Sequence, residues 1–204
     1  MVMKYYFAIS SIILIFSSCK KETVANNPSS EYFPNTTGNY WKYKVVDSIL
    51  NSSSIVELKI VGDKILPGGQ NAKIWVYSYP TRIDTNYVFQ IGDSIKFLDQ
   101  NFAIQYIYKI PLQINNKWTL SEPNHYLSDS TYIIENRTFY LNDYSFEKSF
   151  LLHESGFVPN AFFDKNEWFC PTIGMVTKTE KFFQRIGNVY TKYLYWELIQ
   201  YELK

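Results

Sequence analysis

Aromatic side chains are the most abundant groups in this sequence that could bind a ligand. The chain contains 18 Tyr, 15 Phe and 5 Trp among 204 residues. Such rings can stack on sugars or enclose an apolar ligand, although they also fill cores and pair across strands. Between Lys73 and Tyr79, strand alternation places Trp75, Tyr77 and Tyr79 on one face with Lys73, and we expect this face to point outward. Trp75, Tyr77 and Tyr79 are therefore the predicted ligand-binding residues.

Residues for metal binding or nucleophilic catalysis are scarce. The only histidines are His125 and His153, and the chain has no Cys-x-x-Cys, His-Glu-x-x-His or calcium-loop motif. The segment His153-Glu154-Ser155 contains the residue types of a catalytic triad, but neighbours on a strand point to opposite faces. We expect no metal, no cofactor and no catalytic residue.

Carboxylates leave one enzymatic alternative open. A glycosidase needs two carboxyl groups separated by about 5 to 9.5 Å, and sequence alone does not give that distance. Carboxylates on the surface are the more common case, so we predict that the chain is not an enzyme. The candidates for a carboxylate pair are Asp84, Asp129, Asp143, Glu147 and Glu154.

The first 19 residues are organised as a bacterial lipoprotein export signal. Lys4 provides the positive charge, residues 5–16 form an apolar stretch of 12, and two serines precede Cys19, which resembles a lipobox. Twelve apolar residues are too few to cross about 30 Å of hydrocarbon. We expect residues 1–18 to be removed and Cys19 to carry acyl chains such as palmitate. Because each buried CH₂ contributes about 0.8 kcal/mol, several chains attach the protein to the membrane permanently.

Residues 19–34 are predicted to be the lipidated cysteine and a flexible tether, and residues 35–204 a single domain. Lys20 and Lys21 stand where some bacteria place an inner-membrane retention aspartate, which favours the outer membrane and leaves the membrane face open. Lipidation leaves Cys170 as the only thiol, which we expect to be buried as a small hydrophobic residue. Without Lys4, the chain has 19 basic and 19 acidic residues, so no nucleic-acid partner is expected.

The remainder of the chain has the period-two alternation of β-strands. Turn residues at 67–69 (Pro-Gly-Gly) and 92–93 (Gly-Asp) separate several of the strands. We predict an all-β domain with a single antiparallel, strongly curved sheet of about ten strands, either a half-barrel or a sandwich. The predicted strands lie within 40–45, 56–60, 74–79, 87–91, 95–98, 104–110, 117–120, 131–135, 138–141, 145–153, 175–183 and 189–203.

Two short motifs resemble signatures of a known group of proteins. Residues 33–43 (FPNTTGNYWKY) match F-P-x-x-x-G-x-x-W-x-Y, and residues 171–176 (PTIGMV) match P-x-I-G-x-V. The chain thereby resembles uncharacterised envelope lipoproteins of Gram-negative bacteria, and the resemblance implies an all-β lipoprotein domain. Independently of it, Gly38 and Gly174 fit positions that need a positive φ or a close backbone approach, and Trp41 and Tyr43 are expected to fill the core.

The sequence therefore predicts a lipid-anchored β-domain of the cell envelope that binds a ligand, glycan or partner protein without catalysis. One alternative is a glycosidase-type enzyme, which predicts paired carboxyl groups with perturbed pKa values in a concave pocket. The other is a lipid-carrying, chaperone-like lipoprotein, which predicts a continuous apolar cavity of several hundred Å³.

Overall fold

One antiparallel sheet makes up the part of the chain that the structure describes. The computed structural model describes residues 33–119, 128–158 and 161–204. Among these residues, no helix is long and apolar enough to cross a membrane. The prediction of an all-β fold with one curved antiparallel sheet is confirmed, with 12 strands instead of about ten. The strands are β1 (Tyr40–Asp47), β2 (Ser52–Ile65), β3 (Asn71–Ser78), β4 (Ile83–Ile91), β5 (Ser94–Leu98), β6 (Ile104–Lys109), β7 (Lys117–Trp118), β8 (Ser128–Leu141), β9 (Tyr144–Val158), β10 (Ala161–Cys170), β11 (Gly174–Gln184) and β12 (Val189–Glu202).

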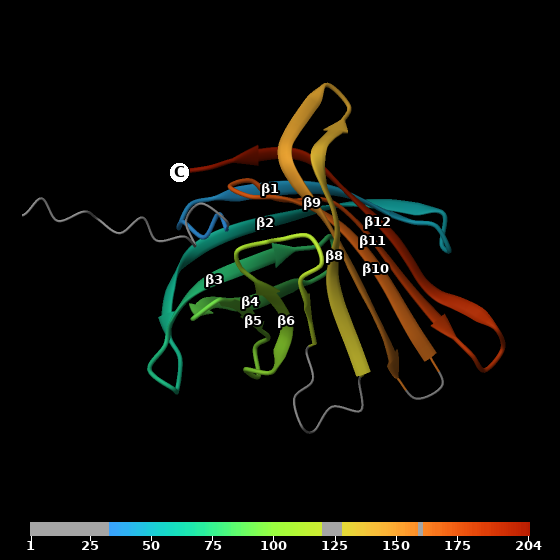
Figure 1. The fold of residues 1–204 in the computed structure, drawn as a ribbon, viewed down its shortest axis with the longest axis horizontal. Coiled ribbons are helices and arrows are strands. Elements are labelled where there is room, and N and C mark those ends of the chain that lie inside the picture. Colours follow the sequence, from blue (N-terminus) through green and yellow to red (C-terminus); the bar gives the residue numbers. More distant parts are fainter. Residues whose placement is uncertain (1–32, 120–127, 159–160) are drawn as a thin grey trace, which may run out of the picture.

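The sheet consists of two wings that join where the first and last strands pair. Its strand order is β6-β5-β4-β3-β2-β1-β12-β11-β10-β9-β8-β7. Tyr40 on β1 pairs with Glu202 on β12, so the two ends of the domain lie side by side in the middle of the sheet (Figure 1). The Trp118 indole on β7 donates a 2.8 Å hydrogen bond to the Ile107 carbonyl on β6. The sheet therefore curls until its two edges approach each other, as in a nearly closed barrel.

The predicted turns occur where Gly and Pro separate the strands. Between β2 and β3, the amide of Leu66 donates a hydrogen bond to the carbonyl of Gln70 (2.9 Å). The amide of Gly69 donates to the carbonyl of Leu66 (2.8 Å). Between β4 and β5, Gly92 has a φ of +57°, a conformation that a residue with a side chain seldom adopts. Both turn predictions are confirmed.

The two sequence motifs contact each other in the fold. Gly38 and Gly174 have φ values of +96° and +102°, as predicted. A Cβ on Gly174 would lie 3.6 Å from Nε1 of Trp41, and this indole donates a 2.6 Å hydrogen bond to the Ile173 carbonyl. Trp41 and Tyr43 are each 1% exposed, which confirms their predicted place in the core. The family resemblance itself stays a prediction.

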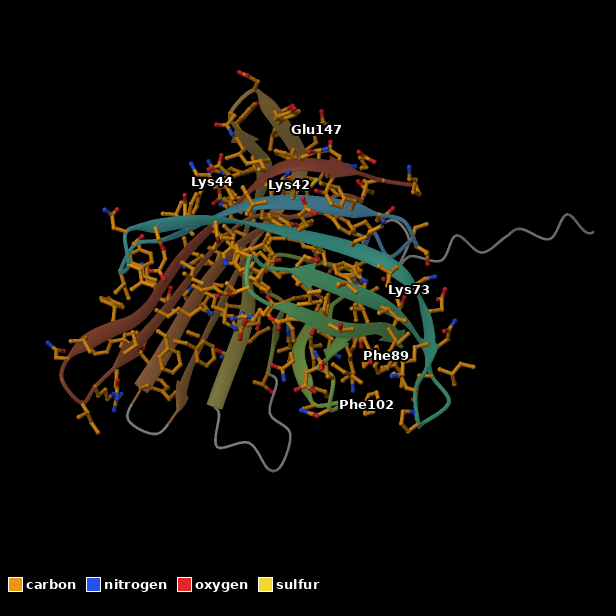
Figure 2. The ribbon with its side chains drawn as sticks, turned by 180° about the vertical axis from the view of Figure 1, so that it is seen from behind. Lys42, Lys44, Lys73, Phe89, Phe102 and Glu147 are labelled. Atoms are coloured by element: carbon orange, nitrogen blue, oxygen red, sulfur yellow. The ribbon has the colours of Figure 1, made fainter. Side chains whose placement is uncertain are left out.

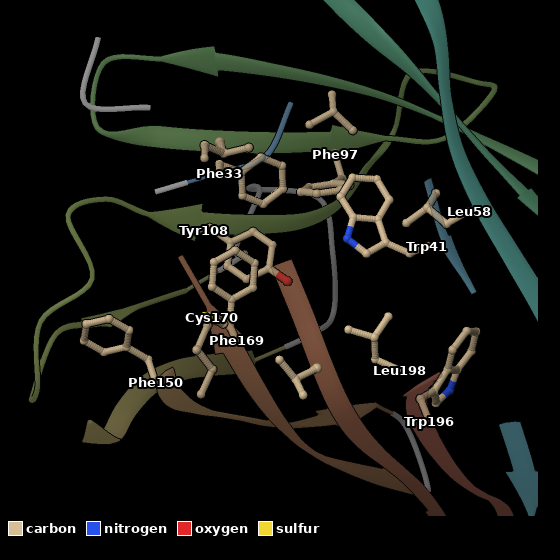
Figure 3. Packing of buried hydrophobic residues seen from close by; sticks show 14 of the residues in the cluster. Phe33, Trp41, Leu58, Phe97, Tyr108, Phe150, Phe169, Cys170, Trp196 and Leu198 are labelled. Carbon is tan, nitrogen blue, oxygen red and sulfur yellow. The ribbon is translucent and has the colours of Figure 1, made fainter. Parts of the chain in front are cut away.

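Phe33 lies at the centre of the core, between the two wings (Figure 3). Its ring centroid is 5.3 Å from Trp75, 5.6 Å from Phe97, 5.5 Å from Tyr108 and 5.7 Å from Phe169. It is 3% exposed. The predicted boundary at residue 35 is therefore wrong by at least two residues, because a buried aromatic side chain cannot belong to a solvated tether.

Strand β10 has no counterpart among the predicted strands. Its inward positions hold Phe163, Lys165, Glu167 and Phe169. The two charged residues break the run of inward apolar residues by which a strand is usually predicted. The predicted strands at 131–135 and 138–141 form one strand, β8, whose register shifts twice opposite β9. Such bulges change which residues face inward and therefore hide a continuous strand from a period-two search.

The convex face carries charged side chains on the outer side of the first strand. Lys42 and Lys44 alternate with Trp41, Tyr43 and Val45, which are buried. Figure 2 shows Lys42 and Lys44 on the outer side of β1. The concave face therefore holds the core and the cavity described next.

Candidate functional site

A cavity of about 870 Å³ lies on the concave face, between the two wings. Strands β1, β3 and β6 supply most of its aromatic side chains, and β10, β11 and β12 supply most of its charged side chains. The cavity therefore has an aromatic wall and an ionic wall. Its volume lies within the range of about 300 to 1,000 Å³ that is usual for small-molecule sites.

The predicted aromatic residues line this cavity and do not point outward. Trp75, Tyr77 and Tyr79 share one face, as the alternation indicates, but that face is the concave one. Lys73 gave the misleading signal. It lies near the end of the strand, where its Nζ reaches Asp63 Oδ1 at 2.7 Å and a long flexible side chain can return to solvent.

Trp75 belongs to the core more than to the binding surface. It is 5% exposed, and its ring stacks on Trp41 at a centroid distance of 5.4 Å as well as on Phe33. Its Nε1 donates a 2.7 Å hydrogen bond to Asn35 Oδ1. Tyr77 and Tyr79 are only half-buried, so they present more ring surface to the cavity. Burial raises the pKa of both phenols, which therefore stay protonated and able to donate hydrogen bonds.

The ionic wall is a cross-strand ladder of opposite charges. In the sheet register, Lys165 on β10 lies opposite Glu154 on β9 and Glu180 on β11, and Glu167 on β10 lies opposite Lys178 on β11. Lys165 Nζ is 3.0 Å from Glu154 Oε1. Opposite charges at facing positions stabilise a strand pair. The six charged residues of this ladder are Glu154, Lys165, Glu167, Lys178, Glu180 and Lys192.

Glu180 forms ion pairs with two lysines. Lys178 Nζ lies 2.8 Å from Glu180 Oε1, and Lys192 Nζ lies 2.6 Å from Oε2. Burial alone would raise the pKa of Glu180, but the two ammonium groups hold it well below its ordinary value. The pKa of Lys178 is raised, because Glu180 and Glu167 outweigh the effect of burial. Both partners therefore remain ionised across the neutral pH range.

Glu167 has the opposite electrostatic environment. It is 5% exposed, and the Tyr108 hydroxyl on the facing wing donates a 2.5 Å hydrogen bond to its Oε1. Burial raises the pKa of Glu167 to about 7, although Lys178 and the hydrogen bond from Tyr108 act against the shift. This carboxyl group therefore changes its charge near neutral pH, directly inside the cavity.

Trp196 on β12 carries a buried donor without a partner among the described residues. The residue is 5% exposed, and its Nε1 has no hydrogen-bond acceptor within the part of the chain that the structure describes. The ammonium of Lys178 lies 4.7 Å from the Trp196 ring centroid, and Tyr79 meets the same ring edge-on at 6.2 Å. A buried unpaired N–H costs about 1–3 kcal/mol, so it points to a missing acceptor.

The predicted carboxylate candidates do not come together in one site. Asp84 lines the cavity and pairs with Arg82 at 3.0 Å, whereas Glu154 is buried in the ladder. Asp143 and Glu147 are exposed on the hairpin of β8 and β9 and do not line the cavity, and Figure 2 shows Glu147 at the part of this hairpin that projects beyond the sheet. The side chain of Asp129 lies outside the described residues.

The histidines and cysteines that the sequence analysis considered do not contribute to the cavity where the structure describes them. His153 Nδ1 is 2.9 Å from Asn166 Oδ1 and does not line the cavity. Cys170 is 4% exposed, which confirms its predicted burial, and burial raises its pKa. Among the described residues, no group of three or more His, Cys, Asp and Glu could hold a metal ion. Cys19 and His125 lie outside the described residues.

The sequence analysis missed most of the ionic wall. Lys165 and Glu167 lie on the strand that it did not predict, and it assigned no role to Lys178 and Glu180 on β11. One signal was available: Lys165, Glu167, Lys178 and Glu180 recur at spacing two within each strand, so each pair must share a face with its neighbouring apolar residues.

Comparisons with known proteins gave no match by sequence and partial matches to solved structures. No family model matches this chain, and no curated protein sequence matches it. A predicted lipoprotein from Parabacteroides distasonis superposes with a TM-score of 0.48 at 16% identity, covering 83% of this chain and 97% of that one. A predicted exported protein with a YmcC-like fold from Bacteroides fragilis gives a TM-score of 0.43 at 10% identity, covering 84% and 98%.

Proposed function

We propose that this protein is a lipid-anchored domain of the cell envelope that binds a small polar organic ligand on its concave face, without catalysis. One observation carries the proposal. A cavity of about 870 Å³ is lined on one side by partly exposed tyrosine rings and on the other by charged side chains. Rings and hydrogen-bonding groups that converge on one cavity are the usual composition of a small-molecule site.

The ionic wall disfavours a lipid-carrying role. An acyl chain in the cavity would remove water from Glu167, Lys178 and Glu180 without offering a hydrogen bond in return. Desolvation of an ion costs several kcal/mol, and existing ion pairs offset only part of that cost. The chaperone-like alternative required a continuous apolar cavity, whereas this cavity is charged along three strands. A polar ligand fits it better.

Attachment to the membrane is a separate part of the proposal. It rests on the leader that precedes Cys19 and on the small residues next to it. Acylation of Cys19 would hold the domain at the envelope, with the outer membrane favoured by Lys20 and Lys21. The ligand would then be a molecule that is present at that surface.

A glycosidase-type activity is the second candidate, because two carboxyl groups in the cavity have pKa values shifted in opposite directions. Glu167 faces Lys178, and Glu180 lies two residues farther along β11, so the two glutamates are diagonal neighbours. The pKa is raised for Glu167 and lowered for Glu180. In a glycosidase, the carboxyl group with the raised pKa acts as the general acid, and the ionised one acts as the base or nucleophile. The two ion pairs of Glu180 make it a weak base, which is why binding without catalysis is the first proposal.

Thermal unfolding in the presence of ligand panels tests the binding proposal. We would use residues 20–204, which contain the whole described fold, against panels of saccharides, amino acids, nucleosides and fatty acids. A ligand at 100 times its Kd stabilises the native state by about 2.7 kcal/mol. A reproducible rise in the unfolding midpoint is expected with a polar panel.

Two matched variants then locate the binding site. Tyr79→Ala removes a ring from the cavity, and Tyr190→Ala removes a ring that is 49% exposed and does not line it. The ligand-induced shift should shrink in the first variant and persist in the second. No shift with any panel, or equal loss in both variants, would contradict the proposal. Release of reducing ends from a saccharide that binds would instead favour the glycosidase candidate.

A further inference from the structure

The indole N–H of Trp196 is a buried donor that bonds to no described residue. It belongs to a residue that lines the cavity. The other indoles that line the cavity, those of Trp41 and Trp75, each donate to a protein oxygen. A hydroxyl or carbonyl oxygen of a ligand next to Trp196 would satisfy this donor.

The charges of the cavity indicate that this ligand is uncharged. Each cationic side chain that lines the cavity already has an acidic partner within 3.0 Å. An anionic ligand would have to compete with Glu180 or Glu154 for these cations. The four cations are Arg82, Lys165, Lys178 and Lys192.

The acidic side chains that line the cavity, among the described residues, already have hydrogen-bond or ion-pair partners. Asp47 Oδ1 accepts hydrogen bonds from the amides of Ile49 and Leu50, and Asp99 Oδ1 accepts from those of Asn101 and Ala103. These carboxylates are therefore committed to turns at the rim of the cavity. A cation next to Glu167 would lie against the ammonium of Lys178, which faces Glu167 across the strand pair.

Uncharged ligands with flat apolar faces and many hydroxyl groups match the remaining surface. Tyr77 and Tyr79 offer ring faces together with phenolic hydroxyls, and Tyr106 adds a third ring beside Glu167 and Tyr108. Aromatic rings pack on the C–H faces of a sugar ring, and paired charged groups can donate to and accept from its hydroxyls.

We infer that the ligand is a neutral saccharide and that Trp196, Lys178 and Glu167 form the subsite that binds its hydroxyl groups, with the ring packed on Tyr79. In this arrangement the Trp196 indole donates to a sugar oxygen. Lys178 donates a second hydrogen bond while it remains paired with Glu180. This inference rests on the proposed function, because it names the ligand class for the same cavity.

Isothermal titration calorimetry on residues 20–204 tests the inference with defined probes. The probes are neutral di- and trisaccharides of glucose, galactose, mannose and N-acetylglucosamine, a digalacturonic acid as the acidic analogue, and palmitate as the lipid. Trp196→Phe keeps an aromatic ring and removes only the N–H. Trp168→Phe is the matched control, since Trp168 stacks on Phe139 at 4.7 Å and does not line the cavity.

The expected result is binding of at least one neutral saccharide in preference to digalacturonic acid and palmitate. Trp196→Phe should weaken it about tenfold, which corresponds to one hydrogen bond of about 1.4 kcal/mol. Trp168→Phe should change the affinity less than twofold. The unfolding midpoint of Trp196→Phe without ligand should stay close to that of the wild type, because the N–H that it loses bonds to no described protein atom.

Failures of the two proposals can be told apart. Preference for digalacturonic acid or palmitate, or an unchanged affinity in Trp196→Phe, would overturn the saccharide subsite and leave a binding cavity in place. Absence of heat with every probe, together with no thermal shift in the wider panels, would overturn both.

Discussion

Glu167 is the residue whose chemistry depends most on its surroundings. It sits on an inward position of a sheet strand, bonded to Tyr108 from the opposite wing, and burial raises its pKa to about 7. Its sequence neighbours Asn166 and Trp168 gave no sign of this, because burial is set by strands far away in the chain. The sequence singled out Trp75, Tyr77 and Tyr79 but expected their face to point outward, and it could not predict which acidic residue would be desolvated. The ionisable groups that act on Glu167 are Tyr43, Tyr77, Tyr106, Tyr108, Glu154, Lys165 and Lys178.

Replacement of Glu167 by Gln should make the protein relatively more stable as the pH rises. A carboxyl group with a raised folded-state pKa contributes its full stability below its unfolded pKa of about 4.5 and loses it as the pH rises through about 7. Gln has no such loss, so the difference in unfolding free energy should shift by roughly 3 kcal/mol in favour of the variant between pH 4.5 and pH 8. Urea unfolding at both pH values measures it. A pH-independent difference would show that Glu167 has an ordinary pKa.

At the scale of the strand, period-two alternation predicted the strands whose inward residues are apolar. It failed for strands whose inward positions hold charged residues. Trp41, Tyr43 and Val45 alternate with lysines and were placed correctly on the inner face. Strand β10 was missed because Lys165 and Glu167 occupy inward positions, and a period-two search takes charged residues as outward. The direction of the β3 face was wrong because Lys73 reaches solvent from the concave side.

The ionic ladder predicts an unequal cost for two similar changes. Glu180→Gln leaves Lys178 and Lys192 without their shared partner at a site where the glutamate side chain is 12% exposed. We expect a loss of at least about 2 kcal/mol in the free energy of unfolding, because a buried ion loses its counter-charge. Glu57→Gln breaks an exposed pair with Lys42 and should cost less than about 1 kcal/mol. Equal losses in urea denaturation would contradict the ladder as a structural element.

The segment before β1 acts as part of the core and not as a tether. Phe33→Ala should lower the free energy of unfolding by about 3–5 kcal/mol, because four aromatic neighbours from both wings lose their shared contact. Phe157→Ala removes a ring that is 55% exposed and serves as the control, with a small expected effect. A small effect of Phe33→Ala would indicate that Phe33 does not contribute to the core and that the predicted tether extends through this residue.

At the scale of the whole molecule, one sheet supports both the cavity and the closure of the domain. The first and last strands pair at its middle, so the wings are held together by backbone hydrogen bonds between β1 and β12 and by aromatic contacts across the concave face. The curved single sheet was predictable from short strands and turn residues. The pairing of β1 with β12 was not, because no local pattern encodes a contact between residues 40 and 202.

The proposed attachment to the membrane also belongs to the scale of the whole molecule and is tested by one substitution. Cys19→Ala removes the only thiol that the leader presents for acylation. We expect the wild-type chain to be acylated and to sediment with membranes, and the variant to lack acyl chains on intact-mass analysis. Recovery of an acylated Cys19→Ala chain would show that the anchor lies elsewhere.

A crystal structure of residues 20–204 with the most stabilising saccharide tests the central claim most directly. The account predicts density for the ligand on the concave face, with a sugar oxygen within about 2.7–3.2 Å of Trp196 Nε1 and a ring packed on Tyr79. Density for the same ligand on the convex face, with the indole N–H of Trp196 still unpaired, would contradict it.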